Sequence, residues 1–234
     1  MAEPLMSLLR AIAAGDHKRA SALIEASPDL ARKPATVGAT RATSTDYFFP
    51  QLGQYLYAGD TALHFAAAAY RTDIAKDLIL HGANPGARNR RGAEPLHYAS
   101  GGRPGSARWN PATQAATITF LIRSGSNPNS TDKSGVTPLH RAVRTRCAAA
   151  VQALLEHGAE PRLGNGSGST PLHLAVQNTG RGGSGDADAL EQQEAIIRLL
   201  VHHGARLTDT DNRGKSVSAS IASGRIKEVV SRLN

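Results

Sequence analysis

Short apolar stretches recur along the chain in pairs, and a glycine follows each pair. Leu63 and Ala66 lie at helical spacing in one stretch, and Ile74 and Leu78 do so in the next. This spacing predicts two short amphipathic helices. Gly82 then provides the left-handed residue that commonly ends a helix. The pattern therefore predicts pairs of helices separated by glycine turns.

A tetrapeptide marks the start of each predicted helix pair. TALH at 61–64 returns as EPLH at 94–97 and as TPLH at 137–140 and 170–173. The first two copies are 33 residues apart, as are the last two, whereas the middle gap is 43 residues. A proline suits the first turn of a helix, and the threonine before it can cap that turn. The repeating unit is therefore 33 residues long, with insertions inside some copies.

The composition fits a thin, repetitive core. Only ten of the 234 residues are aromatic, so the apolar positions are mostly aliphatic or alanine. The 23 glycines and 12 prolines punctuate the chain without the density of a disordered tract. A unit of two short helices cannot bury its apolar faces alone, so neighbouring units have to stack. We expect a folded stack of repeats rather than one deep globule.

The 33-residue period, the TPLH motif with an alanine two positions later, and the HGA turns at 81–83 and 157–159 resemble ankyrin repeats. The resemblance implies an all-α repeat fold: an ankyrin-type solenoid of helix-turn-helix units with hairpin fingers, in a single domain over 1–234. It is weaker at both ends, where atypical units would face water. Six units are expected at about 5–34, 59–88, 92–131, 135–164, 168–210 and 214–234, with insertions at about 35–58, 101–110 and 178–186.

Half of the aromatic residues lie in the first insertion, within eleven residues of sequence. In one interpretation, their rings fold back and seal the junction between the first two units. In the other, some of them line a contact patch or pocket beside the concave face, since tyrosine is a favoured interface anchor. The sequence leaves both interpretations open for Tyr47, Phe48, Phe49, Tyr55 and Tyr57.

Four histidines share one position of the motif, namely His64, His97, His140 and His173. Successive units would place them roughly 10 Å apart, the usual distance between packed helices. That is too far for shared metal ligation at about 2 Å. The resemblance implies instead that each ring hydrogen-bonds the threonine of its motif and nearby backbone. We therefore expect no metal site at these positions.

Two further features are weak candidates for chemistry. Cys147 is the only cysteine, and neighbouring arginines could lower its pKa, but the sequence places no base beside it. The run GRGGSG at 180–185 fits a dinucleotide fingerprint, yet a helix rather than a strand is predicted before it. No nucleophile and base stand at diagnostic spacing. We expect a surface loop, no cofactor and no enzymatic activity.

The charge balance favours acidic partners. Lys and Arg number 27 against 19 Asp and Glu, which gives a net charge of +8 and a pI near 10.1. In ankyrin repeats the finger tips and the exposed positions of the first helix bind partners, so the resemblance implies a concave, Arg-rich recognition face. Its candidate residues in this chain are Asp60, Arg88, Arg90, Arg91, Lys133, Arg144, Gln177 and Arg213.

Together these features predict a non-enzymatic interaction module. Its partner would be a protein with an acidic surface, bound by the Arg-rich face and the aromatic insertion. One alternative is a nucleic-acid-binding protein, which the net charge allows. The other is an enzyme or small-molecule binder with a pocket at the insertion, in which Asp46, Asp60 or His64 would supply polar groups.

The N-terminal stretch does not predict a signal peptide, because Arg10, Asp16 and Lys18 interrupt its apolar residues. The chain also lacks a run of about 18 apolar residues, the length that predicts a membrane helix. We expect a cytoplasmic protein that does not enter the membrane. The sequence leaves the oligomeric state open.

Overall fold

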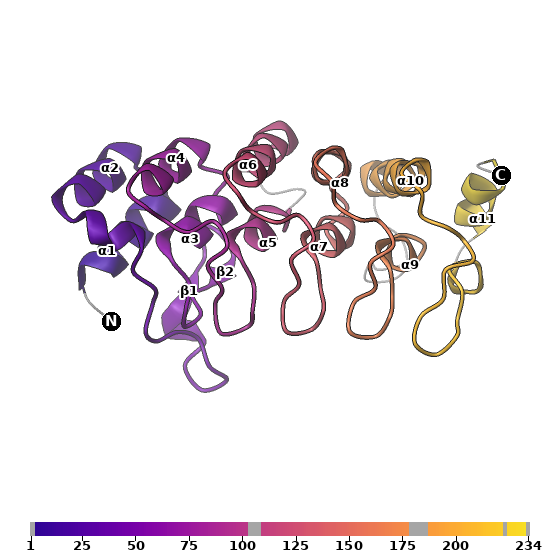
Figure 1. Ribbon diagram of the computed structural model, residues 1–234, viewed down its shortest axis with the longest axis horizontal. Coiled ribbons are helices and arrows are strands. Elements are labelled where there is room, and N and C mark those ends of the chain that lie inside the picture. Colours follow the sequence, from indigo (N-terminus) through magenta and orange to yellow (C-terminus); the bar gives the residue numbers. More distant parts are fainter. Residues whose placement is uncertain (1–2, 103–108, 178–186, 222–223, 233–234) are drawn as a thin grey trace. The chain divides into compact units, whose positions relative to one another are not determined.

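A computed structural model describes residues 3–102, 109–177, 187–221 and 224–232, and this part of the chain is mostly helical (Figure 1). Internal contacts gather the chain into two compact units, which are described separately. Unit 1 comprises Met1–Ala99 with Ala116–Asn127, and unit 2 comprises Ser100–Ala115 with Pro128–Asn234. The helix pairs confirm the all-α repeat fold that the sequence predicts.

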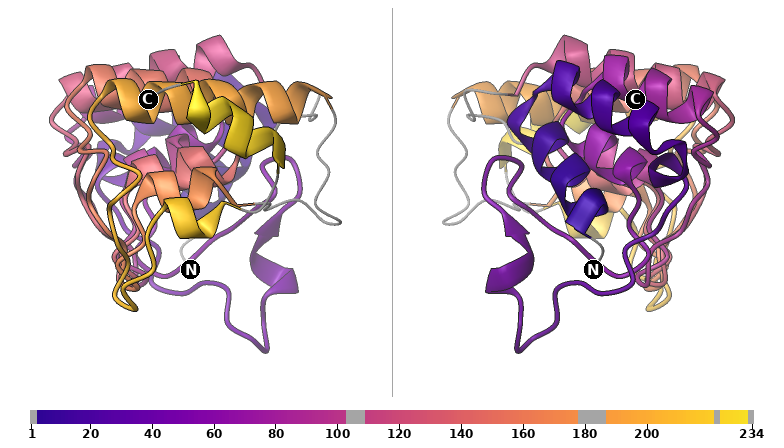
Figure 2. Two further views of the ribbon diagram at one scale, coloured as in Figure 1. Left: turned by 90° about the vertical axis from the view of Figure 1, so that its right-hand side faces the viewer. Right: turned by 90° about the vertical axis from the view of Figure 1, so that its left-hand side faces the viewer.

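Unit 1 consists of two layers of helices. Figures 1 and 2 show α2 and α4 together in one layer, with α1, α3 and α5 in the other. α3 packs against α1, α4 and α5, and α2 packs against α4. Leu63, Ile74 and Leu78 are fully buried between the layers, as the apolar pattern predicts. The bounds are α1 (Glu3–Ala14), α2 (His17–Ala26), η1 (Pro28–Ala31), α3 (Ala62–Ala68), α4 (Thr72–Leu80) and α5 (Pro95–Ala99).

A single left-handed residue joins the two helices of a pair. Gly15 has a φ of 78°, and Tyr70 and Arg146 adopt the same conformation, with φ values of 54° and 53°, although both carry side chains. In each case the second helix begins two residues later, at His17, Thr72 and Ala148. The left-handed region is unfavourable for residues with a side chain. The equivalent location of all three residues shows that the helix pair itself requires this turn.

Unit 2 contains the later helix pairs. α7 packs against α8 and α9, and α10 packs against α8, α9 and α11. The predicted caps are confirmed here, because the hydroxyls of Thr137 and Thr170 accept the backbone N–H of His140 and His173, with proline in the first turn. α6 (Pro111–Arg123) contributes to both units. The other bounds are α7 (Pro138–Arg144), α8 (Ala148–Glu156), α9 (Pro171–Ala175), α10 (Ala187–His202), η3 (Ser218–Ser220) and α11 (Gly224–Ser231).

Neighbouring fingers of unit 2 touch through their backbones. The Gly166 N–H donates to the Ser134 carbonyl at 2.8 Å, and the Asn212 N–H donates to the Ser167 carbonyl at 3.0 Å. Gly135 has a φ of 71°, and a Cβ atom added to it would lie 2.5 Å from the Gly166 nitrogen. A side chain at this position would therefore force the two fingers apart.

The first insertion, which belongs to unit 1, leaves the helix layers and returns to them at adjacent points. The Ala35 N–H donates to the Asp60 carbonyl and the Gly59 N–H donates to the Ala35 carbonyl, both at 2.7 Å. Between these points lie η2 (Thr45–Tyr47) and an antiparallel hairpin of β1 (Phe48–Phe49) and β2 (Gln54–Tyr55). Figure 2 shows this hairpin on the side of α1 and α3, opposite α2 and α4. The insertion thus lies beside the layer of α1, α3 and α5 (Figure 2).

Two of the sequence predictions concern residues outside the described part of the chain. The insertion at 178–186, which includes the glycine-rich run at 180–185, lies wholly there, and 103–108 of the other insertion lie there too. Next to the latter, Asn110 caps α6, since its side-chain oxygen accepts the Thr113 N–H at 2.9 Å. Among the described residues, no helix combines the length and the apolar character needed to span a membrane.

Candidate functional site

The aromatic residues of the insertion divide into a buried and an exposed set. Phe49 is 7% exposed, and its ring meets Phe65 of α3 edge-on with the centroids 4.7 Å apart. Phe48 and Tyr55 are 40% and 37% exposed, and their ring centroids lie 4.9 Å apart. They face each other across the hairpin as cross-strand partners. Phe49 therefore seals the insertion onto the helices, while Phe48 and Tyr55 present their rings to solvent.

Stacked groups continue from Tyr55 to two arginines. The Tyr55 and Tyr57 centroids lie 6.4 Å apart. The guanidinium carbons of Arg90 and Arg91 lie 5.3 Å and 5.1 Å from the Tyr57 centroid, within cation–π range. Arg91 Nη1 also donates to the Tyr57 hydroxyl at 3.1 Å. We call these four residues, together with the exposed ring of Phe48 at their end, the aromatic row.

Asp60 lies in the interior, although the sequence places it among the exposed recognition residues. It is 0% exposed, so it cannot contact a partner, and that expectation is wrong. Its Oδ2 accepts the Tyr57 N–H at 2.6 Å, and its Oδ1 accepts Asn89 Nδ2 at 2.8 Å. The Tyr98 hydroxyl lies 2.9 Å and 3.0 Å from the two carboxylate oxygens. Asp60 thereby ties the end of the insertion to the next finger and to α5.

Asn89 extends this connection to the arginines. Its Oδ1 accepts the backbone N–H of Arg91 at 2.9 Å and that of Ala93 at 3.1 Å. The Arg90 N–H donates to the Ala58 carbonyl at 2.7 Å, and Arg90 Nη2 donates to the Ala39 carbonyl. Tyr57 and Arg91 are consequently held against each other by buried groups beneath them.

The surroundings of Asp60 favour its neutral form. Burial raises the pKa of this carboxyl above its ordinary value of 3.8, and the hydrogen bonds that it accepts from Tyr57, Asn89 and Tyr98 offset only part of that rise. His64 Nε2 lies 3.8 Å from Asp60 Oδ1. Because His64 Nδ1 accepts the Thr61 N–H at 3.1 Å, its ring hydrogen is on Nε2, which lies 3.1 Å from the Ala93 carbonyl. The ring is therefore a neutral neighbour rather than a counter-ion.

We expect the contribution of Asp60 to stability to fall as the pH rises. Its raised pKa means that the folded protein binds this proton more tightly than the unfolded chain does. The contribution is thus fully present below the unfolded pKa and is lost as the pH passes the folded pKa. Urea unfolding of the wild type and Asp60→Asn at about pH 4 and about pH 8 measures this contribution. We expect the free energy of unfolding of the wild type, relative to that of the variant, to be higher at the lower pH. An equal difference at both pH values would contradict the raised pKa.

The other residues that the sequence predicts for the recognition face differ in their exposure and in whether their charges are paired. Arg88 forms an ion pair with the nearly buried Glu94 at 3.0 Å, which neutralises part of its charge. Lys133 and Arg213 are exposed at finger tips of unit 2, and the hydrogen bonds between neighbouring fingers set these tips in one row. Arg144 is exposed at the end of α7, and Gln177 is half-buried just beyond α9.

The motif histidines have structural partners. His140 Nδ1 accepts the Thr137 N–H at 3.3 Å and lies 2.8 Å from the Thr137 hydroxyl, while its Nε2 lies 2.9 Å from the Ser169 carbonyl. Nε2 of His64 and of His173 likewise lies 3.1 Å from a carbonyl oxygen just before the next motif. The implied bonds to threonine and backbone are confirmed for these three rings. Burial lowers the pKa of His140, which favours its neutral form.

Cys147 is a buried structural residue. Its side chain is 0% exposed, and Sγ donates to Gln114 Oε1 at 3.1 Å. Burial raises the pKa of the thiol, so the suggestion that neighbouring arginines lower it is wrong. A thiol of this kind is a poor nucleophile at neutral pH.

A polar cluster between α2 and α4 was not predicted from the sequence. His17 Nδ1 lies 3.2 Å from Asp73 Oδ2, and Ser21 Oγ lies 3.4 Å from His17 Nε2. The Ser21 hydroxyl, however, donates to Asp77 at 2.7 Å, so its hydrogen is not directed at the imidazole. Two hydrogen bonds from Arg71 hold the pKa of Asp73 at about 2. The cluster therefore links two helices, and the four-residue spacing of His17 and Ser21 was its only sequence signal.

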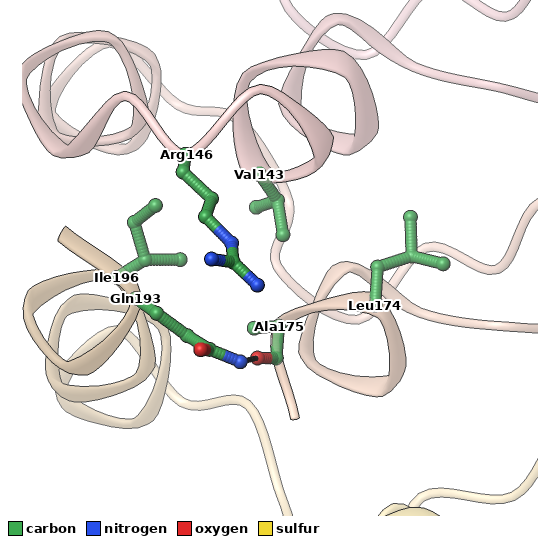
Figure 3. Close-up of a pocket in the computed structure, with 6 residues that line it drawn as sticks. All are labelled: Val143, Arg146, Leu174, Ala175, Gln193 and Ile196. Carbon is green, nitrogen blue, oxygen red and sulfur yellow. Dashed lines mark hydrogen bonds between the residues drawn. The ribbon is translucent and has the colours of Figure 1, made fainter. Parts of the chain in front are cut away.

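A pocket in unit 2 is filled by protein. Figure 3 shows the Arg146 side chain pointing toward Ala175 and Gln193, with Val143, Leu174 and Ile196 around it. Gln193 Nε2 donates to the Ala175 carbonyl at 2.7 Å. The space that remains is too small for a water molecule. The left-handed turn at Arg146 thus directs a cationic side chain inward rather than opening a ligand site.

Comparison with known families agrees with the helix pairs and their caps. A model described as ankyrin repeats in three copies matches residues 110–211, and a single ankyrin-repeat model matches residues 58–90. A comparison with curated proteins gives no significant match. The two family models together cover more than half of the 234 residues. The chain therefore belongs to the ankyrin-repeat family.

Proposed function

We propose that this protein binds a protein partner with an acidic surface, and that the aromatic row supplies the central contact. Ankyrin repeats are generally protein–protein interaction modules. Which surface they use and what they bind differ between members, because function lies in the site rather than in the fold. The proposal assigns the chain no catalytic step.

The observation that carries the proposal is a set of exposed rings that ends on two cations. Phe48 and Tyr55 are exposed, yet the pairing of their strands and the contact between their tilted rings hold them in position. Aromatic and arginine side chains held in place lose little entropy on binding, which is why they dominate interface energies. Arg91 remains exposed beside Tyr57 and can pair with a carboxylate of the partner.

The charge of the chain supports an acidic partner. A net charge of +8 attracts anionic surfaces over about a Debye length, so it raises the rate of encounter more than it fixes the contact. Lys133 and Arg213, exposed on the row of finger tips in unit 2, are proposed as additional contacts.

Replacing the exposed rings is expected to weaken partner binding without unfolding the protein. We expect Phe48→Ser with Tyr55→Ser to reduce affinity at least about tenfold, because both rings would lie at the contact. Affinity purification from the native host with quantitative mass spectrometry identifies the partner, and titration of that partner gives the affinities. Arg91→Gln should weaken binding more at low salt than at high salt.

Leu80→Ser is the matched control, because Leu80 is 83% exposed on α4, in the other helix layer of unit 1. It should leave the affinity unchanged. Equal affinities for the wild type and the double variant would remove the aromatic row from the proposed contact. Capture of nucleic acid in place of a protein, with retention that falls steeply with salt, would favour the nucleic-acid alternative instead.

A further inference from the structure

A pocket of about 260 Å³ lies between α1 and the insertion of unit 1. Met6 and Arg10 of α1 form one wall, and Asp46, Phe48, Phe49 and Pro50 of the insertion form the other. Gln51 also lines the pocket, so the lining is mixed: four apolar residues are accompanied by one guanidinium, one carboxylate and one amide. Asp60 and His64, which the sequence offers as polar groups of such a pocket, are fully buried and do not line it.

The two charged side chains of this pocket are not paired with each other. Arg10 and Asp46 are both exposed, and within the described residues neither forms an ion pair or a side-chain hydrogen bond. Because these two opposite charges line one pocket without forming an ion pair, both can interact with a bound ligand. A ligand with a single charge would be attracted by one of the two residues and repelled by the other, whereas each charge of a zwitterion can lie next to the residue of opposite charge.

We propose that this pocket binds the zwitterion of a free α-amino acid with an apolar side chain. The carboxylate of the ligand pairs with Arg10, which can form two parallel hydrogen bonds to it. The ammonium group pairs with Asp46. The side chain of the ligand lies against Met6 and Phe48, where it removes apolar surface from water.

The size of the pocket agrees with a ligand of this class. A water molecule occupies about 30 Å³ of the liquid, so the pocket of about 260 Å³ is several times larger than a single water and admits a small organic ligand. A single amino acid can therefore occupy the space, and Arg10 and Asp46, which line it, are both exposed to solvent.

The proposal predicts that each charged end of the ligand is recognised by one residue. Calorimetric titration of the full chain with L-leucine, N-acetyl-L-leucine and L-leucinamide separates the two ends, because each derivative lacks one charge. We expect L-leucine to bind at least about fivefold more tightly than either derivative. Asp46→Asn should abolish the preference over N-acetyl-L-leucine, and Arg10→Gln should abolish the preference over L-leucinamide.

Two variants on α2 serve as controls, since Arg19→Gln and Glu25→Gln remove exposed charges away from the pocket. Both should keep the preference for the zwitterion, and circular dichroism verifies that all four variants are folded. Equal binding of the three ligands, absence of binding by all three, or equally tight binding of N-acetyl-L-leucinamide would overturn the proposal. Arg91→Gln tests the partner contact at a residue that does not line the pocket, and Arg10→Gln and Asp46→Asn test the pocket at residues outside the aromatic row, so the two proposals fail separately.

Discussion

Replacing Asp60 with alanine is expected to lower the free energy of unfolding by about 3–5 kcal/mol, the largest loss that we expect from a single substitution of a polar residue. The change removes the acceptor of the Tyr57 N–H, of Asn89 Nδ2 and of the Tyr98 hydroxyl. Asn89 and Tyr98 are themselves buried, so their donors would lose a partner away from water. The end of the insertion would also lose one of its links to the finger that carries Arg90 and Arg91, while the bond from the Arg90 N–H to the Ala58 carbonyl would remain.

Urea unfolding of the wild type and the variant measures this loss, and hydrogen exchange at the Tyr57 amide shows whether the insertion loosens first. Asp29→Ala is the matched control, because the Asp29 side chain is 89% exposed and, among the described residues, forms an ion pair only with Arg32 at the surface. It should cost less than about 1 kcal/mol. If Asp60→Ala is no more destabilising than this control, the buried connection does not stabilise the fold.

The second large effect is expected at Phe49, whose replacement by alanine should cost about 3–4 kcal/mol. Its ring is 7% exposed and meets Phe65 edge-on, so truncation leaves a cavity between the hairpin and α3. The loss combines the transfer free energy of the ring with incomplete collapse of the space around it. Thermal and urea unfolding monitored by circular dichroism measure the change.

Phe48→Ala provides a control at the adjacent position of the same strand. Because Phe48 is 40% exposed, we expect a loss of no more than about 1 kcal/mol. Similar losses for the two variants would mean that the hairpin does not separate a packing face from a solvent face. A stable Phe49→Ala variant would argue that the insertion is not anchored by this ring.

The repeat fold could be predicted because its determinants are local. Thr137, Pro138 and His140 lie within four residues, and together they cap the helix that they begin. His140 then reaches the Ser169 carbonyl, just before the next motif, so one short motif specifies both a helix start and a contact between units. The organisation into six units within a single domain remains a prediction.

The surroundings of Asp60 could not be predicted, because they depend on contacts between distant parts of the chain. Its partners Asn89 and Tyr98 lie 29 and 38 residues away, and the path of the insertion decides whether water reaches the carboxylate. The difference in burial between Phe48 and Phe49, by contrast, follows from their adjacent positions in one strand. Successive residues of a strand face opposite sides, so a short strand there would have predicted one buried and one exposed ring.

The close approach of the fingers restricts where this surface can vary in evolution or in design. At Gly135 a side chain would strike the backbone of the neighbouring finger, so contact between peptide groups sets the distance between these two tips. The flanking Lys133 and Ser134 are exposed and carry no such restriction. Substitutions there can change the charge and shape presented to a partner while the distance between adjacent tips stays constant. Selection can therefore alter what the surface binds one finger at a time, without re-optimising the fold.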